Sequence, residues 1–466
     1  MTTTTRTGEQ PPISTDSVIA RLRAELTGRL LTPTDAEYEP ARVVADGRMD
    51  KHPAAIARVA NAADVAAVIS IVRDSGLELA VRSGGHDGAG HSTTEGGIVL
   101  DVRDLKELVI DPERRTALCG SGLTAVEVSA AAQEHGLVVG FGDTGSVGIA
   151  GITLGGGIGY LVRKHGLTID NLLSADIVTA DGQQLHVDDA NHPDLFWAIR
   201  GGGGNFGVVT RFEYRLNEMP GFVGGMLVLP GTAEVLAGFM HAAEDAPEEL
   251  STIANVMNCP PMPFVPEEHH GQIVLLAMLA YSGNEEDGEK AMAPFRALAT
   301  PLADLVKAQP YTEMFPPGDE SYRPKAVGRT MFLDRVDAEC AQTMLDFLNA
   351  SDASLRAVQL RPLGGAMARV PADATAFAHR ERRVMAIVVS FYEGDDLAAR
   401  QQWAKDLEAA IDQGVPGAYV NFVDDEGEAG VRRAYPGKTF ERLAAVKARY
   451  DPTNVFRLNQ NVPPQP

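Results

Sequence analysis

A glycine-rich loop that connects two strands is the feature that most restricts the fold of this chain. Residues 82–92 read Arg-Ser-Gly-Gly-His-Asp-Gly-Ala-Gly-His-Ser, with His86 near the centre. The apolar runs 77–81 and 98–102 are typical of strands, and the segment between them has no helical apolar period. A Rossmann dinucleotide fingerprint must open a helix whose N-terminus binds the pyrophosphate, so the sequence argues against that fold. A nest of backbone N–H groups for an anionic ligand stays compatible with the loop, because glycine has no Cβ to hold a ligand away.

Length and charge narrow the class of protein. A chain of 466 residues is too long for one ordinary core, so two or three domains are expected. The formal net charge of −22 argues against nucleic acid and against an anionic membrane surface as partners, since both need clustered Lys and Arg. No apolar run is long enough to span a bilayer, and the Thr-rich N-terminus lacks the apolar region of a signal peptide. The sequence therefore predicts a cytoplasmic protein with a disordered tail up to about residue 17.

The cysteines and one histidine pair favour plain structural roles. Cys119, Cys259 and Cys340 are far apart and form no CxxC pair, which predicts reduced thiols with structural roles. His269-His270 follow two glutamates in a polar stretch, but a metal site would need further converging ligands. No metal is predicted.

Helices and strands alternate in the first half of the chain. An amphipathic helix is predicted from about 58 to 74, and a possible capping box at Thr124 and Glu127 starts another helix. Asp181-Gly182 lies between two short apolar runs and predicts a hairpin. This mixture around several glycine loops favours an α+β ligand-binding domain.

The second half has a different character. From about 219 to 411 the chain has few glycine loops, longer helical patterns, apolar strands, and proline-bearing surface loops such as 316–325. A helix is predicted over 439–449, and a short tail follows it.

A second glycine cluster is the densest in the chain. Residues 140–159 contain nine glycines, and each costs up to about 1 kcal/mol relative to alanine inside a helix. Two explanations are open: tight turns at a crowded crossing, or close approach of the backbone to a large flat or phosphorylated cofactor. We favour the cofactor. A third cluster, 201–207, would be a weak signal by itself.

These segments resemble a known family. The loop 82–90 is similar to the flavin pyrophosphate loop of the FAD-linked oxidoreductases of the vanillyl-alcohol oxidase superfamily, also described as PCMH-type FAD-binding proteins. Four later segments lie in the order expected for its berberine-bridge-enzyme-like branch: 155–171, 194–207, 368–380 and 450–461. Together these motifs are specific, and they extend from about residue 50 to the end of the chain.

The resemblance implies an α+β fold. A PCMH-type FAD-binding domain of two subdomains is expected, together with an inserted substrate domain that has an antiparallel sheet and helices. The expected division is an N-terminal tail and start of the FAD domain at 1–49, the FAD-binding domain at 50–218, the substrate-binding domain at 219–411, and a berberine-bridge-like segment at 412–466 that returns to the FAD domain.

The resemblance also implies the residues that bind FAD. They are Arg82, Ser83, Gly84, Gly85, His86, Asp87, Gly88, Gly90, His91, Thr144, Gly145, Gly148, Gly151, Gly155, Gly156, Gly159, Asn205, Gly207, Val208, Val209, Asn459 and Gln460.

Two of these positions bear on covalent attachment of the flavin. His86 matches the histidine that bonds to the flavin 8α-methyl carbon, and we favour this over the alternative of a loop histidine hydrogen-bonded to a carbonyl. Thr144 stands where members with two covalent links have a cysteine, and a hydroxyl cannot form the thioether. A single 8α-histidyl link at His86 is therefore predicted, and a smaller or less exposed substrate is weakly favoured.

Catalysis in this class removes a hydride from a substrate carbon to flavin N5, while a base takes a proton from the adjacent O–H or N–H. By resemblance, Tyr435 stands where some members have a catalytic tyrosine, and a packing tyrosine with a satisfied hydroxyl is an equal alternative. Tyr392, at the end of an apolar strand in the inserted region, is a candidate wall of the substrate pocket. The predicted activity is that of an oxidase acting on an alcohol, amine or related C–H of a small organic or natural-product substrate, with O2 as acceptor and H2O2 as product. Two alternatives stay open: a dehydrogenase with another acceptor, and a flavin-binding protein without catalysis. Assembly as a homodimer also stays open.

Overall fold

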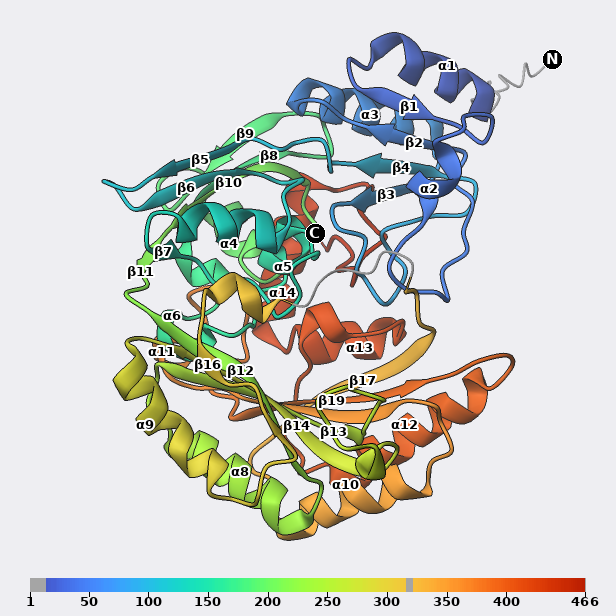
Figure 1. Cartoon of the computed structure of the whole chain (residues 1–466). Helices are drawn as coiled ribbons and strands as arrows, with labels where there is room; N and C mark the ends of the chain where they lie inside the picture. Colours follow the sequence, from blue (N-terminus) through green and yellow to red (C-terminus); the bar gives the residue numbers. More distant parts are fainter. Residues whose placement is uncertain (1–13, 316–321, 466) are drawn as a thin grey trace, which may run out of the picture.

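The computed structural model describes residues 14–315 and 322–465. Three main sheets organise the molecule (Figure 1). Two of them lie in the upper half of the view and are connected to the glycine loops, whereas a larger sheet fills the lower half. The C-terminal segment returns from the large sheet to the upper half of the view. The upper half is therefore built from both the first half of the chain and its C-terminal end.

The first sheet is small and mostly parallel, with the strand order β1-β2-β4-β3. Strand β4 pairs in parallel with β2 and with β3, whereas β1 pairs with β2 in antiparallel fashion. Helices α1 and α3 pack on one face of this sheet (Figure 1). The bounds are α1 Thr15–Glu25, β1 Arg29–Leu31, α2 Tyr38–Arg42, β2 Ala55–Arg58, α3 Ala62–Ser75, β3 Leu79–Arg82 and β4 Ile98–Asp101.

Helix α3 forms where the apolar period predicts it, with one correction at its start. Its apolar face packs into the core between the helices and the sheet. The Asn61 side chain caps the N-terminus, and Gly76 ends the helix in the left-handed conformation at φ +74°. The helix begins at Ala62 rather than near residue 58, because Arg58 is the last residue of β2 and has extended backbone.

Two other predicted segments differ from the structure or lie outside it. Helix α1 begins at Thr15 behind the cap Ser14 and buries Val18 and Leu22, so the predicted disordered tail is wrong for residues 15–17. Residues 1–13 of that tail, and 316–321 of the predicted surface loop, lie outside the described residues.

The second sheet is antiparallel, with the order β5-β6-β10-β8-β9. It contains the predicted hairpin, β8 with β9, and α4 starts at the predicted capping box of Thr124 and Glu127. Helices α4, α5, α7 and α14 pack with this sheet around one core. The bounds are β5 Leu108–Asp111, β6 Thr116–Gly120, α4 Ala125–Gln133, β7 Leu137–Val138, α5 Ile149–Leu154, α6 Val162–His165, η1 Thr168–Asn171, β8 Leu172–Val178, β9 Gln184–Val187, α7 Pro193–Ile199, β10 Val208–Arg215 and β11 Asn217–Glu218.

The third sheet is antiparallel throughout and has the order β15-β12-β14-β13-β18-β19-β17, with β16 also paired to β12. Its strands are β12 Phe222–Pro230, β13 Leu250–Asn258, β14 Ile273–Ser282, β15 Ala303–Asp304, β16 Lys307–Ala308, β17 Ala326–Leu333, β18 Arg356–Pro362 and β19 Val384–Phe391. Helices cover the face that points away from the glycine loops (Figure 1): α8 Ala233–Asp245, α9 Glu285–Arg296, α10 Ala338–Ala350 and α12 Leu397–Ile411. The opposite face is therefore turned toward the glycine loops.

The C-terminal segment joins the halves. It contains η4 Val420–Phe422, α13 Gly427–Ala434 and α14 Lys438–Tyr450. Three short helices lie earlier, between the strands of the large sheet: η2 Glu267–His269, η3 Tyr311–Met314 and α11 Ala366–Arg369. Lys447 is fully buried in α14, and its Nζ donates to the carbonyl oxygens of Asn205 and Phe456 and pairs with Asp451 at 2.7 Å. This contact fixes the third glycine cluster against the tail.

The cysteines and the search for membrane-spanning helices do not distinguish between the possible functions. All three cysteines are free; Cys119 and Cys259 are buried, and burial raises the pKa of Cys119 to about 12. Within residues 14–315 and 322–465, no helix has the length and apolar character needed to cross a membrane.

Candidate functional site

One cavity brings together the three glycine clusters and the C-terminal tail. It has a volume of about 370 Å³, within the range of small-molecule sites. Fifteen of the predicted residues line it: Ser83, Gly84, Gly85, His86, Asp87, His91, Thr144, Gly148, Gly151, Gly207, Val208, Val209, Tyr435, Asn459 and Gln460. Residues more than 350 positions apart in the sequence thus form one wall.

Eight other predicted FAD-binding residues do not line this cavity. Arg82, Gly88, Gly90, Gly145, Gly155, Gly156, Gly159 and Asn205 are not among the lining residues. Arg82 is buried, and its Nη2 donates to Asp101 Oδ2 at 3.0 Å, which ties the ends of β3 and β4 together at the base of the loop. Asn205 donates to the Gln460 carbonyl and accepts from the Val462 N–H, so it anchors the tail.

Two kinds of glycine shape the cavity. At Gly84 an added Cβ would come within 2.3 Å of the Gly148 backbone nitrogen, so the first two glycine clusters touch through their backbones. At Gly151 and Gly204 an added Cβ would meet no protein atom within 4 Å, and both residues line the cavity. These two glycines therefore keep space open for a ligand rather than for protein packing.

Several polar atoms of the wall have no partner within the described part of the chain. Ser92 Oγ, Tyr435 Oη and Asn459 Oδ1 are buried and make no hydrogen bond there. A buried polar group without a partner costs about 1–3 kcal/mol, so a wall of this kind fits a large polar ligand that supplies the missing partners. Complete burial raises the pKa of Tyr435, and its hydroxyl is therefore a hydrogen-bond donor at neutral pH.

His86 projects into the cavity from the first loop. Its Nε2 lies 3.1 Å from Ser146 Oγ, a contact that orients the imidazole ring. Desolvation lowers the pKa of His86, so the imidazole is neutral at pH 7. When Nε2 carries the proton and donates to Ser146, the Nδ1 lone pair is free to act as a nucleophile.

The structure adds a site residue that our sequence reasoning missed. Tyr419, at the start of the C-terminal segment, lines the cavity, and its hydroxyl accepts from the Gly157 N–H at 3.0 Å and the Ile158 N–H at 3.3 Å. Asn421 Nδ2 donates to the same oxygen at 2.9 Å. Nothing in the local pattern marked these residues, because their partners lie about 260 positions earlier.

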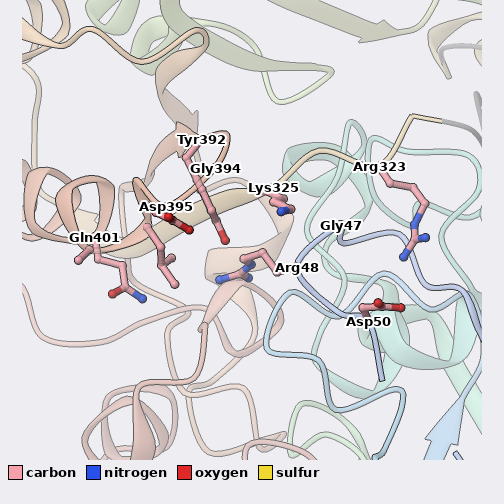
Figure 2. Close-up of a pocket in the computed structure, with 11 residues that line it drawn as sticks. Gly47, Arg48, Asp50, Arg323, Lys325, Tyr392, Gly394, Asp395 and Gln401 are labelled. Carbon is pink, nitrogen blue, oxygen red and sulfur yellow. The ribbon is translucent and has the colours of Figure 1, made fainter. Parts of the chain in front are cut away.

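Tyr392 lies in a different cavity. Figure 2 shows it among Gly47, Arg48, Arg323 and Lys325, with its side chain directed toward Arg48. Arg48 is itself occupied, since it pairs with Asp46 and Asp424 and donates to the Gly88 carbonyl oxygen. Tyr392 therefore does not share the cavity of His86.

Another cavity, called the second cavity below and distinct from that of Tyr392, adjoins the cavity of His86. It has a volume of about 640 Å³, and Asp143 and Thr144 line both cavities. The Asp143 carboxylate is paired with Arg361, which reaches it from β18 of the large sheet. The two cavities thus meet where the glycine loops face the large sheet.

Comparisons with known proteins agree with this geometry. Residues 53–188 match the FAD binding domain family, and residues 418–463 match the family described as berberine and berberine like. The chain is 30% identical over 454 residues to (R)-6-hydroxynicotine oxidase of Paenarthrobacter nicotinovorans, which covers 94% of this chain and 97% of that protein. It is 26% identical over 461 residues to glucooligosaccharide oxidase of Sarocladium strictum, covering 88% of this chain and 87% of the relative.

Solved structures show the same fold. The crystal structure of 6-hydroxy-D-nicotine oxidase from Arthrobacter nicotinovorans superimposes with a TM-score of 0.82 at 28% identity, over 94% of this chain and 98% of that one. The structure of glucooligosaccharide oxidase from Acremonium strictum gives a TM-score of 0.85 at 24% identity, over 96% and 99% of the two chains.

The fold and the cavity define a FAD-dependent oxidoreductase enzyme. The chain belongs to the berberine-bridge-like family of FAD-linked oxidoreductases, whose relatives are FAD-linked oxidases. The predicted α+β fold, with a two-part FAD-binding domain and an inserted antiparallel sheet, is confirmed.

Proposed function

We propose that this protein is an oxidase that carries one FAD, tethered by a single bond at His86, and dehydrogenates an alcohol, amine or related C–H of a small organic molecule with O2 as the electron acceptor. The observation that carries the proposal is the shared cavity, in which a neutral histidine and ligand-facing glycines stand beside a second, substrate-sized cavity. The relatives support the reaction class, because one acts on 6-hydroxynicotine and another on glucooligosaccharides.

The residues at hand fit FAD. The backbone nest around residues 83–87 and the second glycine cluster would hold the pyrophosphate, and the residues 456–460 of the tail would cover the ring system. A bound flavin supplies the hydride acceptor for the reaction. His86 would attach through Nδ1, which carries the unprotonated lone pair when Nε2 donates to Ser146 Oγ. Glucooligosaccharide oxidase from Acremonium strictum has a 6-S-cysteinyl, 8α-N1-histidyl FAD, a linkage to two residues.

The side chain at residue 144 supports a single link. Thr144 lines the cavity, and by resemblance it stands where members with two covalent links have a cysteine. The remaining candidate, Cys119, does not line the cavity and is held protonated by burial in β6. Tyr435 is proposed as a protonated hydrogen-bond donor to the bound flavin. Tyr392 is proposed as a residue of the separate cavity that Arg48 and Lys325 also line. Cytoplasmic location and assembly as a homodimer stay predictions of the sequence.

Anaerobic reduction followed by exposure to air tests the proposed activity. A panel of small alcohols and amines is mixed with the purified yellow protein without oxygen, and loss of the absorbance near 450 nm identifies a reductant. On admission of air we expect rapid reoxidation with one equivalent of H2O2. Slow reoxidation by O2, with fast reoxidation by an artificial acceptor, would identify a dehydrogenase instead. Absence of reduction by every compound would favour a flavin-binding protein without catalysis.

A further inference from the structure

We propose that the second cavity is the substrate compartment, that it takes a compact apolar molecule with one N–H or O–H donor, and that Asp143 accepts the hydrogen bond from this donor. The proposal rests on the proposed function and names its substrate class. It makes Asp143 a specificity-determining residue.

The position of Asp143 is the first argument. Asp143 and Thr144 are the two residues common to the linings of both cavities. A molecule that occupies the second cavity and reaches the flavin cavity must therefore pass these side chains. The Asp143 carboxylate is partly exposed, at 24% of its side-chain surface, so it is open to a ligand.

The second argument is that the carboxylate is held in place. Arg361 is 4% exposed and donates through Nη2 to Asp143 Oδ2. Arg361 is fixed in turn, because its Nε donates to Gln359 Oε1 at 2.8 Å and Gln359 donates to Asn255 Oδ1 at 2.8 Å. Thr144 Oγ1 lies 3.2 Å from Asp143 Oδ1. Each carboxylate oxygen has two lone pairs, so acceptor sites remain free for a ligand.

The walls of the cavity define the rest of the ligand. Five of the lining residues have apolar side chains: Met226, Met278, Met314, Leu305 and Val306. Methionine side chains adapt to apolar and aromatic groups, and their sulfur is only a weak hydrogen-bond acceptor. A buried sugar hydroxyl that faced these five residues would lose about 1–3 kcal/mol for want of a strong partner, so they favour an apolar ligand body.

Acidic side chains outnumber basic ones in the lining. Asp143, Asp304 and Glu313 line the cavity with one cation, Lys307, and Asp304 is itself paired with Arg296. Arg361 donates through Nη2 to Asp143 and through Nε to Gln359, whereas its buried Nη1 has no partner in the described residues. An anionic substrate is therefore disfavoured by the carboxylates of Asp143 and Glu313 rather than by the lack of a cation. Because Arg361 offsets the charge of Asp143, recognition rests on the hydrogen bond rather than on net charge, and both amines and alcohols are accepted.

Ligands that cannot be oxidised provide the test. Cumylamine and 2-phenyl-2-propanol carry their donor on a carbon without hydrogen, so they bind without turnover. We would titrate both into the holoenzyme by isothermal calorimetry, beside the matched anion 2-methyl-2-phenylpropanoate and the sugar cellobiose. The amine and the alcohol should bind at least tenfold more tightly than the anion and the sugar. Tighter binding of either the anion or the sugar would overturn the assignment of the ligand class.

Variants test the role of Asp143 itself. Asp143→Asn should weaken cumylamine and 2-phenyl-2-propanol by at least tenfold, and Met278→Trp should abolish their binding by filling the cavity. Asp170→Asn is the matched control, because Asp170 also pairs with a buried arginine, Arg380, and lines neither cavity. It should leave both affinities within threefold.

The outcomes separate this inference from the proposed activity. Either of two results would overturn the inference. One is that Asp143→Asn binds cumylamine and 2-phenyl-2-propanol within threefold of the unmodified protein, and the other is that a folded Met278→Trp variant still binds them. Because none of these ligands is oxidised, the binding result stands whether or not the flavin is reduced by any substrate.

Discussion

At the scale of single residues, the environment of a side chain decides its chemistry. His86 is a loop histidine by sequence, yet desolvation in the cavity lowers the pKa of its imidazole, and its Nε2 lies 3.1 Å from Ser146 Oγ. Tyr435 shows the opposite case. Burial raises the pKa of its hydroxyl, so it is suited to donate a hydrogen bond and poorly suited to accept a proton at neutral pH.

The tether is tested at this scale. The protein is precipitated with acid, and the colour should remain in the pellet because the flavin is bonded to His86. His86→Ala should release the flavin into the supernatant. His91→Ala serves as the control, since His91 lies in the same loop and should leave the bond intact. A yellow supernatant from the unmodified protein would show that no covalent link forms.

At the scale of elements, helix α14 holds the C-terminal tail against the third glycine cluster. Lys447 and Asp451 are both fully buried, one turn apart. Asp451 also accepts the N–H groups of Val455 and Phe456, so the start of the tail is fixed to the end of the helix. Phe456 lines the flavin cavity, and this polar cluster therefore shapes one of its walls.

Removing the lysine should be costly. Lys447→Met leaves a buried carboxylate without its cation, and we expect a loss of about 3–5 kcal/mol in the free energy of unfolding. The control is Arg449→Met in the same helix, where the pair with Asp194 is exposed and worth at most about 1 kcal/mol. Urea unfolding followed by circular dichroism measures both. Equal losses in the two variants would contradict the structural role of the buried pair.

At the scale of the whole molecule, the C-terminal segment stabilises the contact between the large sheet and the FAD-binding half. His379 is buried against Phe332 of β17, and its Nε2 lies 3.0 Å from the Ala434 carbonyl oxygen at the end of α13. Burial lowers its pKa from 6.5 to about 4. The folded protein thus binds fewer protons at His379 than the unfolded chain does between these two values.

This difference predicts how stability depends on pH. The free energy of unfolding should fall as the pH drops from about 6.5 to 4, by roughly 3 kcal/mol from this group. His379→Gln has no titrating group here and should show a flatter dependence. Urea unfolding of both proteins at pH 7.5, 5.5 and 4.5 measures it. Parallel curves for the two proteins would show that His379 does not titrate on unfolding.

Local chemistry is what the sequence by itself determined. Four predicted features depend on neighbours within about 15 positions. They are the strand-loop-strand context of residues 82–92, the capping box before α4, the hairpin of β8 and β9, and the apolar face of α3. Such patterns, with the family motifs, were sufficient for the α+β fold and the FAD-linked class.

The tertiary structure decided which residues share the site. It placed Gly148 and Gly151 in the cavity wall, left Gly155 outside the lining, placed Tyr392 in another cavity, and added Tyr419 to the wall. It also paired Asp143 with Arg361 across 218 positions. Periodicity shows which face of an element is buried, but it carries no information on which distant segment packs there. The cavity is made from such distant contacts, so only the folded chain could define it.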